Sequence, residues 1–282
     1  MSGDHAAAAP AERAPRRAEE HAVSWLAQEW GVISSLWWRD LLRLARERSR
    51  WIGVLAQPVL FWVMLGSGLA ETFRMPGGGP SYLTYFYPGV LVMTVLFTAI
   101  FGTISVIEDR QLGFLQAVLV APGSRGALVL GKTAGVTTMA LIQTAILLGA
   151  APLAGYSFGQ VSWPALLLVL LLGSVTLTTL SFSMAWVMSS TQGYHAVMSV
   201  VLIPLWMVSG AMFPAPASWM GVVVRFNPIS YIVSGVRAAL AGPGAPTRGP
   251  GLGTSLLVLG ALSLAGFALA VLATRRGGAR RE

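Results

Sequence analysis

One stretch of this chain matches the pattern of a nucleotide-binding loop. Gly126–Thr133 satisfies G-x-x-x-x-G-K-[ST], in which backbone N–H groups surround a phosphate. The residues between its two glycines are apolar and bulky, which suits a helix rather than a loop. Phosphoryl transfer also needs a carboxylate to hold Mg²⁺, and the chain has no Asp or Glu between Asp109 and Glu282. We therefore interpret this stretch as a helix start, where Gly131 permits close packing and Lys132 anchors the helix at the cytoplasmic interface.

Other catalytic chemistry lacks candidate residues. The chain has no cysteine, which excludes disulfides, thiolate metal ligands and cysteine nucleophiles. Its histidines are His5, His21 and His195, and only His195 falls near an apolar stretch. It lies in the short turn 192–195, where we interpret it as a solvated side chain. We predict no catalytic residue and no metal site, so the sequence argues against an enzyme.

The composition indicates an integral membrane protein. Hydrophobic residues make up 55% of the 282 residues and charged residues 11%, against roughly 25% charged residues in soluble domains. A soluble chain of this length cannot hide that much apolar surface. The net charge of +8 does not indicate nucleic-acid binding, because the basic residues flank apolar stretches instead of forming one patch.

Six apolar stretches are long enough to cross a hydrocarbon layer, which takes about 20 helical residues. None of them contains a Lys, Arg, Asp or Glu. We predict an all-α polytopic membrane protein with a transmembrane domain over 51–274. The predicted spans are Trp51–Ala70, Thr84–Ile107, Thr133–Gly155, Trp163–Ser189, Ala196–Phe213 and Thr254–Thr274.

The distribution of basic residues predicts the orientation. Most of the 19 Lys and Arg residues lie before the first span, between spans two and three, or in the basic tail 275–282. The positive-inside rule then places both termini in the cytoplasm of a bacterium, with the chain in the inner (plasma) membrane. Residues 1–23 are rich in Ala, Pro and charge, which predicts a disordered cytoplasmic tail.

Residues 24–50 have the pattern of an amphipathic helix that lies in the headgroup plane. The alternative is an ordinary helix packed on a soluble domain, but the chain offers no such domain. Its apolar stripe is Leu26, Trp30, Ile33, Trp37, Leu41 and Leu44, and its polar stripe is Gln28, Ser35, Arg39, Arg43, Arg46 and Arg50.

Two connecting segments are unusual. The loop from Glu108 to Lys132 holds an acidic pair and then a short apolar helix, Phe114–Val120, which could dock in a groove of a soluble partner. The segment 214–253 holds two apolar pieces separated by Asn227-Pro228. We predict that it forms a re-entrant hairpin covered by spans five and six, since irregular backbone at membrane depth must be covered by protein. A plain surface loop is the alternative.

Polar residues within the spans are hydroxyls and amides. The hydroxyls of span four fit either close helix packing or a translocation surface. Aromatic and polar residues of the other spans favour a path for a hydrophobic or amphiphilic substrate. The predicted path residues are Gln57, Phe61, Phe97, Phe101, Trp206 and Met207.

The chain resembles the permease subunits of type-2 ABC exporters, a family that includes daunorubicin-resistance and nodulation-export permeases. The resemblance covers residues 24–275. It rests on three features. The first is the loop from Glu108 to Lys132, with its acidic start, a "vaP.sR" turn over 120–125 and an "lGK" end over 130–132. The second is an "NP..y…lR..l" signature over 227–240, and the third is the plan of an amphipathic helix, six spans and a broken hairpin. Gly123 departs from the pattern, which has a bulkier residue after the proline, and this predicts a looser turn.

The resemblance implies a mechanism and site residues. A permease pair, expected to be a homodimer, would work with two copies of a separate ATPase subunit that binds ATP and Mg²⁺, and the permease itself would bind membrane lipid but no cofactor. The implied hairpin residues are Asn227, Pro228, Tyr231 and Arg237. The implied coupling residues are Glu108, Asp109, Arg110, Gly113, Phe114, Pro122, Arg125 and Lys132.

Two other functions stay open from the sequence. An ATP-independent secondary transporter or channel is the main alternative, although ion-coupled carriers usually place charged residues inside the membrane. A membrane-embedded enzyme would need an acid, base or nucleophile cluster that the chain does not offer. The substrate, whether drug, lipid or lipid-linked glycan, is not distinguished by the residues.

Overall fold

The computed structural model describes residues 10–69, 80–115, 118, 123–214, 219–242 and 249–276, of which 10–24, 50, 219, 220 and 276 are described by their backbone alone. Pro122 and most of the predicted loop helix Phe114–Val120 lie outside the described residues.

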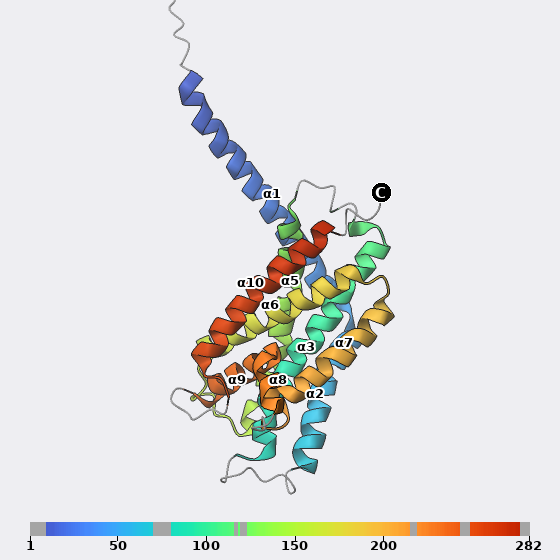
Figure 1. Ribbon diagram of the computed structural model, residues 1–282, viewed down its shortest axis with the longest axis vertical. Coiled ribbons are helices and arrows are strands. Elements are labelled where there is room, and N and C mark those ends of the chain that lie inside the picture. The colour runs from blue at the N-terminus through green and yellow to red at the C-terminus, as the bar shows by residue number, and fades with distance from the viewer. Residues whose placement is uncertain are drawn as a thin grey trace, which may run out of the picture.

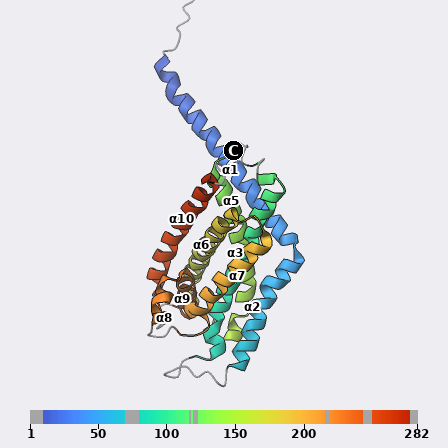
Figure 2. The ribbon, with the colours of Figure 1, turned by 45° about the vertical axis from the view of Figure 1, so that its right-hand side comes forward.

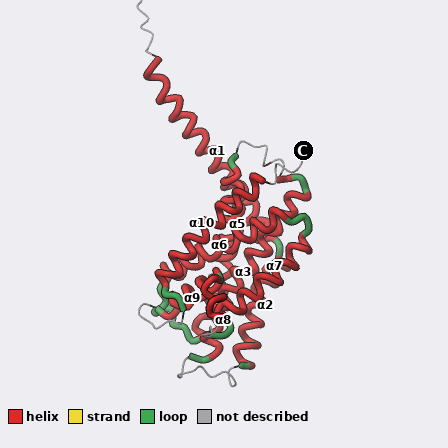
Figure 3. Tube along the Cα trace, in the orientation of Figure 1, coloured by secondary structure: helices red, strands yellow, loops and turns green. Residues whose placement is uncertain are grey.

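The described residues form helices and connecting turns, with no strand among them (Figure 3). This confirms the all-α class. A 3₁₀ turn follows α5 at Ala151–Ala154, and a π-helical turn follows α7 at Met207–Ala211. The α-helices are α1 Pro10–Arg46, α2 Arg48–Gly68, α3 Tyr82–Gln111, α5 Arg125–Leu148, α6 Trp163–Val187, α7 Thr191–Trp206, α8 Trp219–Phe226, α9 Pro228–Ala241 and α10 Leu252–Arg276.

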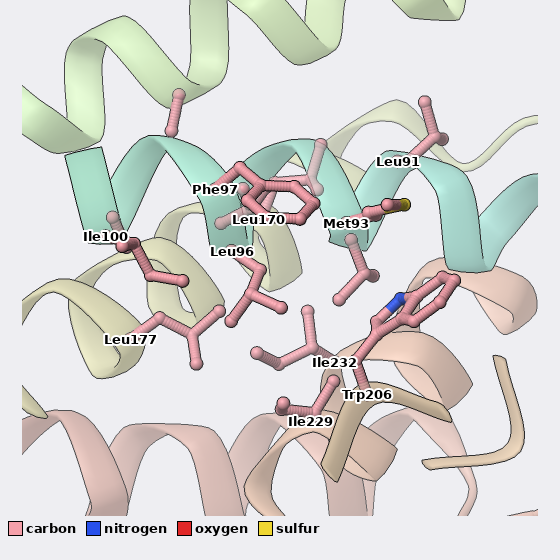
Figure 4. Close-up of a cluster of buried hydrophobic side chains, with 14 of the residues drawn as sticks. Leu91, Met93, Leu96, Phe97, Ile100, Leu170, Leu177, Trp206, Ile229 and Ile232 are labelled. Carbon is pink, nitrogen blue, oxygen red and sulfur yellow. The ribbon is translucent and has the colours of Figure 1, made fainter. Parts of the chain in front are cut away.

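Helix α3 is the centre of the bundle. It packs against α2, α5, α6, α7 and α9, and nearly all of its residues are buried. Figure 4 shows its apolar side chains, Leu96 and Phe97 among them, beside Leu170 of α6, Trp206 of α7 and Ile232 of α9. By contrast, only 22% of the residues in the apolar stretches of α2 and α10 are buried. Movement at either end of α3 therefore reaches most of the bundle.

The bundle has two distinct ends (Figures 1 and 2). The end of α3, the start of α5 and the end of α10 lie together with the second half of α1, and we call this the loop end. The turn before α3, the helices α8 and α9, and the start of α10 lie at the opposite end, which we call the hairpin end. The second half of α1, which leads into the bundle, and the end of α10 thus lie at the same end, as an even number of membrane crossings requires.

The number of spans differs from the sequence count. Among the described residues, five helices are long and apolar enough to cross a membrane, and α5 is not one of them. Its helix begins at Arg125 rather than Thr133 and ends at Leu148, and it carries Lys132 and Gln143, which lower its mean hydropathy. The other five predicted spans overlap α2, α3, α6, α7 with its π-helical turn, and α10, with ends that differ by a few residues. Six crossings therefore stay a prediction.

Helix α1 begins earlier than the sequence suggested. Residues 1–23 were expected to be disordered, but the helix starts at Pro10 and runs to Arg46. Proline is favoured at the first helical position, and the Ala, Arg and Glu residues that follow are strong helix formers. The predicted helix 24–50 is also divided, since Glu47 is non-helical and α2 begins at Arg48.

The second half of α1 packs along α5, while its first half leaves the bundle (Figure 1). The contact runs through small residues of α5. A Cβ built on Gly131 would lie 2.9 Å from Cβ of Leu36, and one on Gly135 would lie 3.2 Å from Cβ of Asp40. The interpretation of Gly131 as a close-packing residue is therefore confirmed. Trp30, in the predicted apolar stripe, stays exposed.

Candidate functional site

The acidic end of α3 belongs to a buried cluster of charges at the loop end. Asp109 lies in the last turn of α3, Lys132 directly follows the packed Gly131 of α5, and Asp40 faces them from α1. The Lys132 Nζ lies 3.0 Å from Oδ2 of Asp40 and 2.5 Å from Oδ2 of Asp109. Each of these three side chains is only 2–3% exposed. The cluster therefore ties three helices together in a site closed to water.

Two arginines of α1 complete the cluster. Arg43 places Nη1 3.2 Å from Oδ1 of Asp109 and Nη2 2.5 Å from Oε2 of Glu108. Arg39 pairs with Asp109 and, at 3.2 Å, with Asp40. Together with Lys132 these residues supply three cations against three carboxylates. We call these six residues the ion cluster: Arg39, Asp40, Arg43, Glu108, Asp109 and Lys132. Because charges taken out of water are costly unless compensated, this balance lets Asp40, Asp109 and Lys132 be buried, while Arg39, Arg43 and Glu108 stay partly exposed.

The position of Lys132 corrects one interpretation from the sequence. We expected it to anchor α5 at the membrane surface, but its ammonium group is buried and pairs with carboxylates of two other helices. A Lys near a span boundary usually reaches for the headgroups. Here α1 crosses α5 at Gly131, next to Lys132, and places Asp40 beside the Lys132 ammonium group. The Lys132 side chain therefore points into the bundle instead.

The chain turns back at the end of α3. Gly113 adopts φ +73°, a left-handed conformation that glycine tolerates best. The turn brings Phe114 against α1, where the Arg39 guanidinium lies 3.8 Å from the ring centroid. The first part of the loop is thus bound to the same arginine that contacts Asp109.

Arg110 points to the other side of α3. It donates hydrogen bonds to the backbone carbonyls of Trp186 and Met188, and Gln111 Nε2 donates to the carbonyl of Ser189 at 2.9 Å. These carbonyls end α6, where the helix leaves its last acceptors unpaired and carries partial negative charge. The end of α3 is therefore connected to α6 as well as to α1 and α5.

The far end of the loop is fastened to α1. Ser124 caps α5, and its backbone N–H and hydroxyl donate to the two carboxylate oxygens of Glu29 at 2.8 and 2.6 Å. A Cβ on Gly123 would lie 2.8 Å from Val32 of α1. The missing side chain therefore allows tight contact with α1, which differs from the looser turn we expected. Arg125 begins α5, and its Nη1 is buried without a hydrogen-bond partner.

The predicted hairpin residues meet at one junction. Asn227 caps α9 through its Oδ1, which accepts from the Ile229 N–H at 3.0 Å, and its Nδ2 donates to the carbonyl of Leu205 at 2.5 Å. Pro228 is the first residue of α9. The Tyr231 hydroxyl donates to the carbonyl of Arg225 in α8 at 2.8 Å. These contacts join α8, α9 and the end of α7.

Arg237 extends that junction to α3. Its Nη2 donates to the carbonyl of Gly210 at 3.0 Å, and its guanidinium lies 4.4 Å from the ring centroid of Tyr85. The hairpin residues implied by the resemblance therefore lie together. Re-entry of α8 and α9 into the membrane stays a prediction.

A cavity of about 190 Å³ lies between α2, α3 and the end of α7. Five of the six predicted path residues line it, namely Gln57, Phe61, Phe97, Trp206 and Met207. The sixth, Phe101, stacks on Phe97 instead and lies edge-to-face against His195. His195 is exposed, as expected, but it lies in the first turn of α7 rather than in a loop. The remaining walls are Met93, Leu96, Ile203 and Met212, so Gln57 supplies the cavity's one side-chain amide.

Sequence reasoning missed the contribution of α1 to the ion cluster. Arg39 and Arg43 were assigned to a solvated polar face, and Asp40 was not singled out. A signal was present, because Asp40 lies four residues from both Leu36 and Leu44, in the middle of the face that packs on the bundle. A carboxylate at that position needs a buried cation from a neighbouring helix.

The comparisons with known proteins agree with this arrangement. Residues 32–241 match the family model described as ABC-2 type transporter. The chain is 28% identical to a protein named transport permease ycf38 of Cyanophora paradoxa, over 71% of this chain and 70% of that protein. It is 26% identical to the inner membrane transport permease YadH of Escherichia coli (strain K12), over 76% and 84%. It is 27% identical to Nodulation protein J of Rhizobium leguminosarum bv. trifolii, over 86% and 87%.

The matched region begins within α1 and ends with α9, so it includes the ion cluster, the cavity and the hairpin junction. The chain therefore belongs to the ABC-2 type transporter family and is a membrane subunit of an ABC transporter.

Proposed function

We propose that this chain is the permease of an ATP-driven exporter that moves a hydrophobic or amphiphilic molecule, such as a drug, a lipid or a lipid-linked glycan, out of the cytoplasm. Permeases of this family generally work with an ATPase subunit. In the proposed complex two copies of this chain, as a homodimer in a bacterial inner membrane, bind two ATPase subunits at the loop end. ATP and Mg²⁺ are bound by the ATPase, and both ends of the permease chain face the cytoplasm.

The observation that carries the proposal is the attachment of the loop to three helices at once. A force applied to the loop by a partner reaches α3 through Asp109, α5 through Lys132 and α1 through Asp40. Because these charges are closely spaced and shielded from water, the helices resist separation at this point. The loop end is therefore suited to move as one body.

Helix α3 connects that body to the cavity. Asp109 and Phe97 are twelve residues apart on one helix, which is about 18 Å at 1.5 Å per residue. A tilt of α3 driven at Asp109 displaces Phe97 and Leu96 in the cavity wall. Motion at the ATPase then reaches the cavity along α3 itself, without another helix between them.

The cavity supports the proposed substrate class. Its walls are aromatic, aliphatic and methionine side chains, with a single amide at Gln57. Methionine side chains adapt to differently shaped apolar partners. An apolar group with one hydrogen-bonding atom fits such a lining better than a multiply charged molecule.

The proposal is tested by reconstitution with the ATPase encoded beside this chain. Copurification, followed by ATP-dependent export of a fluorescent amphiphile from liposomes, is the expected result. A test variant replaces Asp109 with Asn, which keeps the side-chain shape but removes the charge. We expect that this variant retains ATPase binding but loses most transport. Gradient-driven transport by the permease alone, without any ATPase, would instead favour a secondary transporter or channel.

A further inference from the structure

The end of α7 has an irregular backbone at the wall of the cavity. Pro204 lies inside α7 and lacks the N–H that would bond to the carbonyl one turn earlier. The next turn, Met207–Ala211, is π-helical, and Gly210 within it adopts φ +85° and kinks the chain. Such π-turns are rare and occur often at functional sites. Met207 and Met212, on the two sides of the kink, both line the cavity.

The kink is held by hydrogen bonds to its own backbone. The carbonyl of Gly210 accepts two of them, from the Tyr85 hydroxyl of α3 at 2.9 Å and from Nη2 of Arg237 in α9 at 3.0 Å. Directly before the kink, Trp206 Nε1 donates to the carbonyl of Gly89 in α3 at 2.9 Å. The π-turn therefore has fixed attachments to two neighbouring helices.

The hydrogen bond from Arg237 to the Gly210 carbonyl depends on the backbone conformation of Gly210. Among the described residues, the partners of this guanidinium are the carbonyls of Gly210 and Tyr85 and the Tyr85 ring. A carboxylate partner would stay paired over a range of side-chain rotamers. The Gly210 carbonyl points at Arg237 only while Gly210 keeps its left-handed conformation, because rotation about φ and ψ redirects the carbonyl.

We propose that Arg237 is a positioning residue that holds the π-turn of α7 against α3 and thereby closes the cavity from the hairpin end. When the bond to Gly210 breaks, the segment from Met207 to Met212 swings away from α3 and opens the cavity there. The inference deepens the proposed function, since it assumes that this cavity belongs to the transport path. The closure itself is a property of the permease alone.

The chain offers a direct assay because it has no cysteine. Met212→Cys places a reporter thiol at a cavity wall where the native side chain is 8% exposed, and Leu115→Cys places a second reporter at the loop end, where exposure is 1%. Maleimide labelling rates of the purified permease in micelles then measure opening at each end separately. Neither substrate nor ATPase is required.

In this background Arg237→Met keeps an apolar stem but removes all donors. We expect about a tenfold faster labelling at Met212→Cys, the change that corresponds to loss of one hydrogen bond from a charged donor, and an unchanged rate at Leu115→Cys. Arg237→Lys restores much of the protection, since an ammonium group can still donate to the Gly210 carbonyl. Tyr85→Phe, which removes the other donor, also raises the rate. Arg225→Met, at an exposed arginine of α8, is the matched control and leaves both rates unchanged.

Two results would overturn the inference. One is an unchanged labelling rate at Met212→Cys in Arg237→Met, whatever the rate in Tyr85→Phe. The other is an equal rise at both reporters, which means general loosening of the fold rather than opening at the kink. If the permease binds no ATPase, the proposed function fails while the labelling result still stands.

Discussion

The two ends of α3 are held in different ways. At the loop end, Asp109 joins an ion cluster in which carboxylates and cations of three helices pair directly. At the hairpin end, Tyr85 and Arg237 hold the backbone carbonyl of Gly210. Paired side-chain charges tolerate small backbone changes, whereas a bond to one carbonyl depends on the local φ and ψ. On the proposals above, the loop end moves as a unit, whereas the hairpin end can release.

Replacing Lys132 with Met has the largest expected effect. It removes the one fully buried cation of the ion cluster and leaves Asp40 and Asp109 to the partly exposed arginines. Breaking a buried pair costs about 3–5 kcal/mol in the free energy of unfolding. Denaturant unfolding of the permease in mixed micelles measures the loss.

The matched variant adds Asp40→Asn to Lys132→Met and should recover part of the lost stability, because one uncompensated carboxylate is removed. A loss below about 1 kcal/mol in the single variant would be typical of a surface pair. That result would contradict the view of the loop end as one rigid body.

Arg237→Met has the next largest effect. A hydrogen bond from a charged donor contributes about 1.5–3 kcal/mol, so we expect a smaller loss of stability than for Lys132→Met. Hydrogen exchange should place that loss in the π-turn and α9 and leave the loop end protected. If the two variants destabilise the same region, the distinction between the two ends of α3 fails.

Gly131→Ala tests the packing beneath the ion cluster. The added Cβ would lie 2.9 Å from Leu36 and 3.0 Å from the carbonyl oxygen of Ile33, so α1 must shift. Overpacking of this kind costs about 1–3 kcal/mol, and thermal unfolding in micelles measures it.

The matched control is Gly126→Ala on the same helix, where the added Cβ would have one neighbour at 3.4 Å. Alanine is the better helix former by about 1 kcal/mol, so this control should be neutral or slightly stabilising. Equal losses in both variants would show that contact with α1 at Gly131 does not determine the result.

Ser124→Ala is expected to have the smallest effect. It removes the cap of α5 and the hydroxyl bond to Glu29, at a cost of about 1 kcal/mol for a lost helix cap. The backbone N–H still donates to Glu29, so the loop stays attached. Calorimetry detects the shift, and a loss as large as that of Lys132→Met would mean that Glu29 rather than the ion cluster secures the loop.

Much of the site could be predicted from residue types, but its pairings could not. The aromatic residues Phe61, Phe97 and Trp206 were placed on a common path because large rings within spans favour a shared apolar space, and they do line one cavity. The partner of Lys132 was missed because the pairing depends on how α1 crosses α5. That crossing is decided by the small surface at Gly131, which local periodicity does not reveal.

The span count shows a related limit. Hydropathy averages a helix over its length, and α5 combines an apolar body with Lys132 and Gln143. Their polarity is offset by contacts within the bundle, since Lys132 pairs with Asp40 and the Gln143 Oε1 accepts a hydrogen bond from Thr98. A scale that scores each residue against lipid cannot register partners that come from other helices.

The pairing of Asp40 with Lys132 also imposes an order on synthesis. The two residues are 92 positions apart, so at about 5–20 residues per second the lysine is made roughly 5–20 s after the aspartate. Until then α1 carries a carboxylate on the face that it must bury, which keeps that face in contact with water. Docking of α1 therefore waits for α5, and the ribosome delivers α2 and α3 before the ion cluster can form at the loop end.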